Sequence, residues 1–439
     1  MQGERKTLTQ LSVPICLETL FYMLSGMVDT LMLSSVSDQA VGAVGTANTY
    51  IGVFIIMFGV ISSGMVAVMS QNIGAGRPGI AYQARQLGLV FNALTGILMS
   101  VVLAVFSGGI LRAVSVAPAL LESAETYLKI VGGASFLNAL IPIFSSYLRV
   151  FGYTKHSLIG TVVGNVINII LNSVFLFVFH WGVMGVATAT VISKVVNLII
   201  VAAMGAVLIK AKQSPERAQP RRILAQIVKI GFPSAFETAL YNVAMTFIVC
   251  FMNHMDTDGM NVTARSYAMQ IANFSYCVGA ALAQANAIMT GWRIGAKKYE
   301  ECDRGTRKAV IYGLVTATCF SVTFAITGRF IVHIFTDDTQ MIELVVKLLV
   351  VDIFLEFGRV TNLVYGQALK TSGDAIFPVI MGAIFMYLFA VGGTYFLGIH
   401  MGLLAVGAYI AMAGDECARA VGMVLRWKSG KWKSKSLVE

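Results

Sequence analysis

The sequence predicts an all-α integral membrane protein with twelve transmembrane helices, arranged as two pseudo-symmetric six-helix bundles. Three observations favour this fold class. The chain is 57% hydrophobic and 12% charged, about half the charged fraction of an ordinary soluble domain. Its apolar residues form runs of about 20, long enough for a helix to cross a hydrocarbon core of about 30 Å. Several motifs of the first half return in the second half in the same order, as expected of a transporter built from repeats.

Each apolar run is expected to be a helix, because a backbone surrounded by lipid must satisfy its own hydrogen bonds. The alternating pattern of a membrane barrel is absent from the sequence. The first run is too long for the core of a signal peptide and no small-residue cleavage site follows it, so we expect an uncleaved first span. The twelve expected spans are residues 11–33, 41–68, 87–111, 127–148, 157–180, 183–209, 225–252, 264–290, 308–327, 344–366, 375–397 and 402–425.

A charged, proline-containing segment, KAKQSPERAQPRR, separates the sixth and seventh spans. Such a composition is typical of a linker. We therefore expect an N-terminal six-helix lobe over residues 1–209, a cytoplasmic linker over 210–223, a C-terminal six-helix lobe over 224–425, and a basic cytoplasmic tail over 426–439.

The two halves share an internal repeat. Six spans per half preserve the orientation of the repeat, so the halves should be related by an axis along the membrane normal. The repeat pairs Pro14, Glu18, Thr19 and Tyr22 with Pro233, Glu237, Thr238 and Tyr241, and it pairs Leu148-Arg149 and Gly152 with Leu369-Lys370 and Gly373.

Lysine and arginine are concentrated on one side of the expected membrane. They fill the linker, the segment 293–308 and the tail, whereas the opposite side carries few basic residues. Positive charge marks the cytoplasmic side, so a multi-pass protein of the cell (inner or plasma) membrane with both termini in the cytoplasm is expected. The basic residues assigned to the opposite side are Arg112, Lys129, Arg265, Arg329 and Lys347.

Ten charged side chains lie within the expected spans beyond the first five residues of each, and seven of them are acidic. A charge at bilayer depth costs at least about 2.5–3.5 kcal/mol, so such groups face a protein interior or a water-filled cavity. The acidic excess favours a cationic substrate or coupling ion. The ten are Glu18, Asp29, Lys194, Glu237, Asp352, Glu356, Arg359, Asp415, Glu416 and Arg419.

The first span carries a polar stripe. Glu18, Tyr22, Ser25 and Asp29 follow a spacing of i, i+4, i+7 and i+11, which places them on one face of a helix. Asp29 is the leading candidate for ion coupling, and an Na⁺ ion could bind near it. The alternative is that Asp29 is a structural acid, hydrogen-bonded to a neighbouring helix. Glu18 and Glu237 lie near the cytoplasmic ends of their spans, where they either attract cations and gate or simply reach the interface.

Span ten has a similar stripe of Asp352, Glu356 and Arg359. Glu356 and Arg359 are spaced for a structural pair along the helix. Asp352 then remains as an unpaired acid and a candidate for ion or substrate binding.

In span twelve, Asp415 and Glu416 precede Arg419 by four and three residues, which favours local neutralisation. Lys194, the only basic residue of span six, is expected to pair with a carboxylate.

Amide side chains mark two further spans. Asn165, Asn168 and Asn172 share a face of span five, and Gln270, Asn273 and Gln284 share a face of span eight. Both sets suit ion or substrate ligands, and both equally suit hydrogen bonds between neighbouring helices.

Four sequence stretches resemble the MATE (multidrug and toxic compound extrusion) transporter family. They are Pro14–Thr30 with its Glu18 and Val28-Asp29-Thr30, QNIGAGR at Gln71–Arg77, LRVFG to GNVINIILN at Leu148–Asn172, and EFGRVTNLVYGQALKTSGD at Glu356–Asp374. The resemblance implies two lobes around a V-shaped cavity and export of organic cations by H⁺ or Na⁺ antiport. Asp29 matches the family's first-span carboxylate. Asn172 and Arg359 stand where some members carry acidic residues.

Other function classes lack support in the sequence. It contains no GxxxxGK[ST], HExxH or GxSxG motif, and its six cysteines show no metal or disulfide spacing. We therefore expect no enzyme activity and no cofactor beyond H⁺ or Na⁺ as coupling ion. The leading interpretation is a secondary active multidrug exporter of organic cationic or amphipathic compounds, working by alternating access. Its expected partners are these small molecules and membrane lipids rather than nucleic acid, and the chain is expected to be a monomer. The alternative is a flippase for lipid-linked oligosaccharides.

The orientation is testable with single cysteines in a background without the native ones. Arg217→Cys should resist an impermeant maleimide added to intact cells and react once the cells are opened, because the linker is expected to be cytoplasmic. Asp337→Cys, on the opposite side, serves as the reactive control. Labelling of position 217 from outside intact cells would contradict the orientation.

Overall fold

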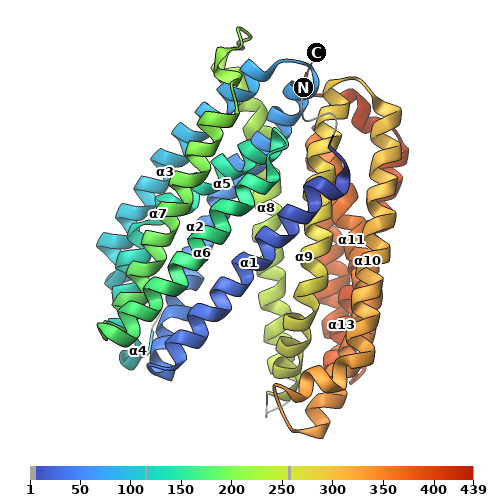
Figure 1. The fold of residues 1–439 in the computed structure, drawn as a ribbon. Helices are drawn as coiled ribbons and strands as arrows, with labels where there is room; N and C mark the ends of the chain where they lie inside the picture. Colours follow the sequence, from blue (N-terminus) through green and yellow to red (C-terminus); the bar gives the residue numbers. More distant parts are fainter. Residues whose placement is uncertain (1–5, 114–115, 256–258, 439) are drawn as a thin grey trace. The chain divides into compact units, whose positions relative to one another are not determined.

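The computed structural model describes residues 6–113, 116–255 and 259–438, and in them the protein folds into helices joined by short turns and loops (Figure 1). Its contacts divide the chain into two compact units. The first consists mainly of Val13–Gly231, and the second of Leu8–Ser12 together with Phe232–Glu439. The boundary therefore lies inside a helix, and residues 224–231, which the sequence assigned to the second lobe, pack with the first.

The first unit contains six spanning segments. Two of them include short wide-turn stretches, η2 (Leu128–Gly132) and η3 (Val174–Val178). The α-helices are α1 (Leu8–Ser34), α2 (Asp38–Gly74), α3 (Pro78–Ala113), α4 (Pro118–Tyr127), α5 (Ser135–Val150), α6 (Thr154–Ser173) and α7 (Gly182–Leu208). The fourth segment bends by 41° between Pro118–Gly132 and Ser135–Val150.

The second unit contains the other six segments. They are α8 (Pro220–Asn253), which begins in the first unit, α9 (Met260–Gly295), α10 (Tyr299–His333), α11 (Thr339–Ser372), α12 (Ile376–Phe385) continued by η5 (Met386–Val391) and η6 (Thr394–His400), and α13 (Leu404–Lys428). A short turn, η4 (Ala211–Gln213), lies in the linker.

These segments match the twelve expected spans, so the sequence-based fold class is confirmed. Eight of the described helices are long and apolar enough to cross a membrane, and the bent pair makes a ninth. α9, α11 and α13 complete the twelve; they carry more polar side chains. Most helices extend beyond the apolar run that predicted them. α10, for example, opens with Glu300 and Glu301, because a helix continues past the hydrocarbon region.

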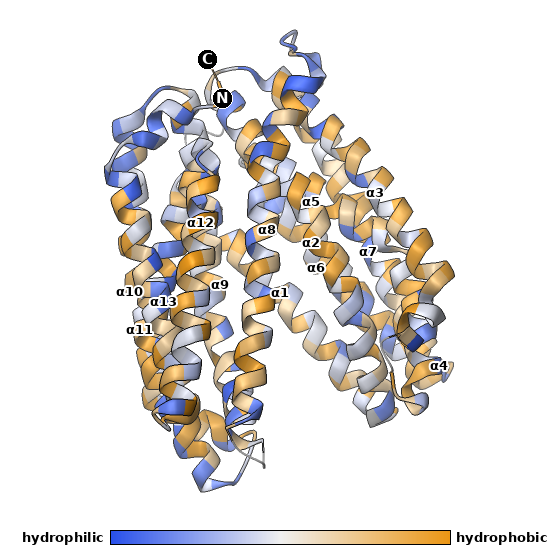
Figure 2. Ribbon diagram, turned by 180° about the vertical axis from the view of Figure 1, so that it is seen from behind, coloured by the Kyte–Doolittle hydropathy of each residue, from blue (hydrophilic) through white to orange (hydrophobic). Residues whose placement is uncertain are grey.

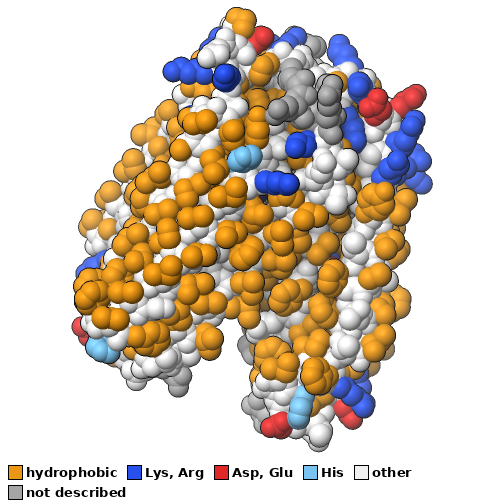
Figure 3. Space-filling model, in the orientation of Figure 1, with side chains coloured by type: hydrophobic (Ala, Val, Ile, Leu, Met, Phe, Trp, Pro, Cys, Tyr) orange, Lys and Arg blue, Asp and Glu red, His pale blue; other side chains and the backbone are white. Residues whose placement is uncertain are grey.

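Hydrophobic residues predominate along the middle of the helices of each unit (Figure 2). On the face drawn in Figure 3, apolar side chains cover this middle region and most charged ones gather toward the helix ends. Exposed examples are Val105 on α3 and Ile326 on α10. Large exposed apolar surfaces normally mark a binding or membrane contact, and their presence around each unit fits a multi-pass membrane protein.

The end of the chain is packed rather than free. The rings of Trp427 and Trp432 stack with their centroids 4.2 Å apart, and both side chains are buried. Trp427 Nε1 donates to Asp303 Oδ1 at 2.9 Å, and Trp432 Nε1 donates to the carbonyl of Trp427 at 2.9 Å. The basic segment η7 (Lys431–Lys435) is thereby held against the second unit.

Within the first unit, α2 and the start of α8 cross at two glycines. A Cβ atom on Gly64 would meet the backbone carbonyl of Ile227, and one on Gly231 would meet that of Val60. Only glycine allows two helix backbones to approach so closely, which is the usual device at helix crossings in membranes.

We expect Gly64→Ala to lower stability by about 1–3 kcal/mol, because the added methyl group would force two backbones apart. Gly59→Ala is the matched control on the same helix: its Cβ would meet nothing within 4 Å, and alanine favours a helix by about 0.5–1 kcal/mol over glycine. Thermal midpoints of the purified variants compare the two. Equal midpoints would show that the crossing tolerates a side chain.

Candidate functional site

The second unit encloses a cavity of about 570 Å³. Its walls come from α8, α9, α11, α12 with η5, and α13, and they combine methionine and tyrosine side chains with seven charged ones. Volumes of about 300–1,000 Å³ are typical of small-molecule sites. The charged lining residues are Glu237, Arg265, Asp352, Arg359, Lys370, Glu416 and Arg419.

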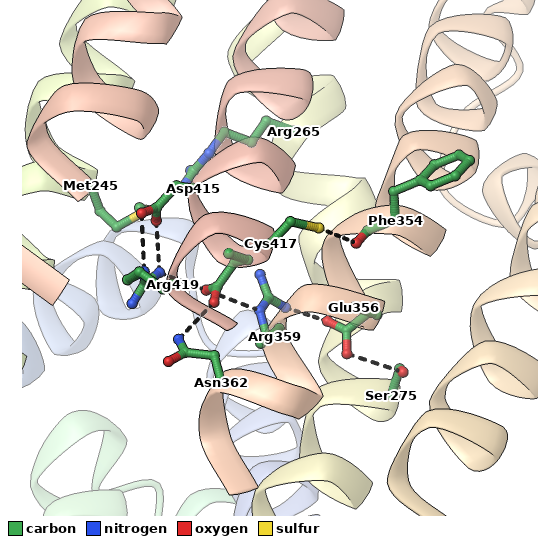
Figure 4. Close-up of polar contacts among 11 residues, drawn as sticks. Met245, Arg265, Ser275, Phe354, Glu356, Arg359, Asn362, Asp415, Cys417 and Arg419 are labelled. Atoms are coloured by element: carbon green, nitrogen blue, oxygen red, sulfur yellow. Dashed lines mark hydrogen bonds and ion pairs between the residues drawn. The ribbon is translucent and has the colours of Figure 1, made fainter. Parts of the chain in front are cut away.

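A chain of buried ionic contacts runs along one side of this cavity (Figure 4). Glu356, which is 0% exposed, pairs with Arg359 on the same helix and accepts a hydrogen bond from Ser275 at 3.3 Å. Arg359 Nε lies 3.8 Å from Glu416 Oε1, and its guanidinium lies over the ring of Tyr276. The spacing predicted the Glu356–Arg359 contact, and the structure adds the acid on α13.

The same chain continues along α13. Glu416 accepts from Asn362 Nδ2 at 2.9 Å and lies 2.9 Å from Arg419 Nη2. Arg419 also binds Asp415 through two parallel hydrogen bonds of 3.0 and 2.7 Å. This is the local neutralisation that the span-twelve spacing indicated. Such two-point contacts are among the strongest between side chains.

Glu237 is held by an ion pair. Its Oε2 lies 2.6 Å from Lys370 Nζ, so the side chain contacts a basic group within the bundle instead of reaching for the interface. In the first unit, Glu18 lies 2.7 Å from Arg149 Nη2 and is buried. Glu18 corresponds to Glu237 in the internal repeat, and Arg149 corresponds to Lys370, so each unit holds the equivalent ion pair.

Two charged lining residues have no such partner. Asp352 is 3% exposed and forms no hydrogen bond or ion pair with the described residues. Arg265 is 7% exposed, and its only polar contact there runs from Nη2 to the sulfur of Met245 at 3.7 Å. Asp352 was expected to be unpaired.

Arg265 was wrongly assigned to an outer connection. It is the second residue of the expected eighth span, and α9, which begins at Met260, buries it within the bundle. Met269 and Tyr276, which also line the cavity, follow Arg265 at i+4 and i+11. This spacing puts the three residues on one face of a helix, and it is the feature of the sequence that could have identified Arg265.

Asp29 lies in the first unit beside the amides of α6. Asn172 Nδ2 donates to Asp29 Oδ1 at 2.6 Å and also contacts Asn168 Oδ1 at 3.3 Å. No basic side chain among the described residues forms an ion pair with Asp29. Asn165 instead donates to the backbone carbonyl of Phe21 at 2.7 Å. α6 therefore brings one amide to the carboxylate, supports that amide with a second, and uses the third to hold α1.

Further hydrogen bonds connect the helices of the first unit. Ser157 and Thr161 donate to Glu18 Oε1 at 3.0 and 3.4 Å. Lys194 Nζ donates to Asn138 Oδ1 at 2.9 Å, so its hydrogen-bond partner is an amide. Among the described residues it forms no direct ion pair with a carboxylate, and Asp29 is the acid with which its charge interacts.

The span-eight amides do not act as a set. Gln270 is exposed and Gln284 is half-buried, and neither is among the cavity-lining residues. Asn273 does line the cavity.

A bundle of membrane-spanning helices around a polar, charged cavity defines a membrane transporter. The family model MatE matches residues 14–174 and 233–396, and the chain belongs to this family, the MATE transporters. It is a family of transporters and not of enzymes.

Individual relatives match over nearly the full length. The chain is 32% identical over 437 residues to the uncharacterized transporter YisQ of Bacillus subtilis (strain 168), covering 98% of this chain and 96% of that one. It is 26% identical to the probable multidrug resistance protein NorM of Thermotoga maritima, covering 99% and 94%. A solved multidrug resistance MATE family transporter in an outward-facing conformation shares the fold, with a TM-score of 0.88, 18% identity and coverage of 97% and 96%.

The buried pair on α11 gives an asymmetric prediction. Arg359→Met should lower stability and expression more than Glu356→Gln. The methionine variant leaves Glu356 with only Ser275, whereas the glutamine variant leaves Arg359 near Glu416. Stranding one partner of a buried pair costs about 3–5 kcal/mol.

The double variant should recover much of the loss, because Glu416 keeps Arg419 and Asn362. Expression level, elution profile and thermal midpoint are the measurements. A double variant as unstable as Arg359→Met alone would argue against the pair.

Proposed function

We propose that the chain is a secondary active multidrug exporter that moves organic cationic or amphipathic compounds out of the cell in exchange for H⁺ or Na⁺. Relatives named as multidrug resistance proteins support this function. The cavity of the second unit, with flexible methionines and aromatic rings beside charged groups, is suited to varied amphipathic molecules. We further propose a plasma-membrane location, cytoplasmic termini and a single chain as the working unit.

Asp29 is the proposed coupling residue, and one observation carries this assignment. Its carboxylate is bound by the Asn172 amide alone among the described residues and has no ion-pair partner there. Glu18 and Glu237, by contrast, are each paired with a base. A carboxylate in a poorly solvated site favours its protonated form unless a cation is bound, so a proton and a cation can compete for it.

The coupling ion is H⁺ or Na⁺. For Na⁺, the surrounding oxygens offer a partial ligand set. Asn172 Oδ1 is buried with no hydrogen-bond partner among the described residues, and Asn168 Oδ1 lies close by. Together with Asp29 these are the side chains that would hold the ion. For H⁺, Asp29 alone suffices, and the Asn172 amide orients it.

One observation favours the alternative of a flippase for lipid-linked oligosaccharides. The cavity of the second unit is lined by four basic and three acidic side chains, although seven of the ten charged side chains that lie beyond the first five residues of the expected spans are acidic. Basic groups would suit a pyrophosphate. Because Arg359, Lys370 and Arg419 are already paired with acids, only Arg265 is free of an ion pair to receive an anion, and we rank the drug exporter first.

Asp29→Asn should fold normally and lose gradient-driven efflux, because an amide cannot exchange a proton for a cation. The measurement is dye efflux by purified protein in liposomes under separately imposed pH and Na⁺ gradients. Glu122→Gln, an exposed acid on α4, is the matched control and should transport like the wild type.

Elution profile and thermal midpoint check folding of both variants. Wild-type efflux by Asp29→Asn would remove Asp29 from the coupling mechanism. Loss of efflux together with loss of folding would support the structural role instead.

A further inference from the structure

Five of the seven charged side chains that line the cavity of the second unit are neutralised by ion pairs, and two are not. Glu237 and Lys370 pair with each other, whereas Arg359, Glu416 and Arg419 belong to the ionic chain along α11 and α13. The remaining two are opposite in sign: Arg265 on α9 and Asp352 on α11.

Arg265 is an incomplete site. A guanidinium carries five N–H donors and no acceptor. Here Nη2 has only a weak sulfur acceptor at 3.7 Å, and the buried Nε has no partner among the described residues. The side chain is 7% exposed and lines the cavity. Buried charges are normally paired, so an acidic group entering from the cavity would supply what this site lacks.

Asp352 is the complementary case. It is 3% exposed, it lines the same cavity, and it has no hydrogen-bond donor among the described residues. Tyr409 lines the same cavity as these two charged side chains. No ion pair joins Asp352 to Arg265 within the described chain, which leaves both charges available to a bound molecule.

The rest of the wall is adaptable. Methionine has three rotatable bonds and a polarisable sulfur, and it recurs at sites that accept varied ligands. Tyrosine rings add flat apolar contact area. The methionines and tyrosines of the cavity are Met245, Met269, Met386, Met412, Met423, Tyr241, Tyr276 and Tyr409.

We propose that this cavity binds amphipathic zwitterions, with Arg265 holding the acidic group and Asp352 attracting the cationic group. The inference rests on the proposed export function and names a substrate class for it. A planar carboxylate matches the forked donors of arginine. A molecule carrying both charges neutralises both unpaired residues, whereas a simple cation leaves Arg265 without a partner.

Two dyes that differ by one ester provide the probe. Rhodamine 110 has a free carboxylate on a cationic ring system, and rhodamine 123 is its methyl ester. Fluorescence anisotropy with the purified full-length protein in lipid nanodiscs gives both dissociation constants without any ion gradient. The wild type should bind rhodamine 110 about tenfold more tightly than rhodamine 123, as expected for one charge-assisted contact.

Variants test whether Arg265 causes the preference for rhodamine 110. Arg265→Met should bring the ratio of the two dissociation constants to about one, and Arg265→Lys, which keeps the charge without the planar fork, should give an intermediate ratio. Asp352→Asn should weaken both dyes and preserve the ratio. Arg329→Met, an exposed position outside the cavity, is the matched control and should retain the wild-type ratio.

Equal affinity for the two dyes in the wild type, binding of neither, or a preference that survives in Arg265→Met would overturn the inference. If Arg265→Met fails its elution and melting controls, an unchanged ratio in Arg265→Lys overturns it instead. Gradient-driven efflux of rhodamine 123 without a preference for rhodamine 110 would reject the zwitterion site and leave the export function standing. A clear preference for rhodamine 110 without gradient-driven efflux would support the zwitterion site and reject the export function.

Discussion

Neutralising charge inside an apolar helical bundle is the constraint on which this structure depends. The ion pairs Glu18–Arg149 and Glu237–Lys370 meet it in the same way in the two units, at 2.7 and 2.6 Å. Each pair connects a proline-containing helix to the C-terminal end of another helix of the same unit. The first pair connects α1 to α5, and the second connects α8 to α11. A buried carboxylate without its base would be costly, so each pair stabilises the position of the proline-containing helix.

Beyond that shared pair the units differ. In the first, amides of α6 hold α1 through Phe21 and Asp29. The second uses a continuous ionic chain from Glu356 to Asp415, which keeps three acids and two arginines buried together. Amides suit a site whose carboxylate must change its charge, since they accommodate either form. Fixed ion pairs suit a wall whose electrostatic field must stay constant while ligands enter and leave.

The fold could be predicted from the sequence because apolar length and helical spacing determine it. The repeat even matched Arg149 with Lys370 and Glu18 with Glu237 before any contact was known. Contacts between different helices could not be predicted. The partner of Glu18 lies on α5, and the partner of Lys194 is Asn138; neither can be read from the spacing along one helix. Arg265 was missed because it lies at the very start of its expected span, where spacing alone does not tell a buried side chain from one that reaches the interface. The packing of Trp432 was hidden within a basic, loop-like stretch.

The central claim is that an ion gradient drives small molecules through this chain. Its most direct test is the accumulation of ethidium in liposomes that contain the purified wild-type protein, under an imposed pH or Na⁺ gradient and without ATP. We expect one gradient to drive the dye against its own concentration difference, and an ionophore for that ion to stop the movement. Dye that moves only down its own gradient under both conditions would contradict it.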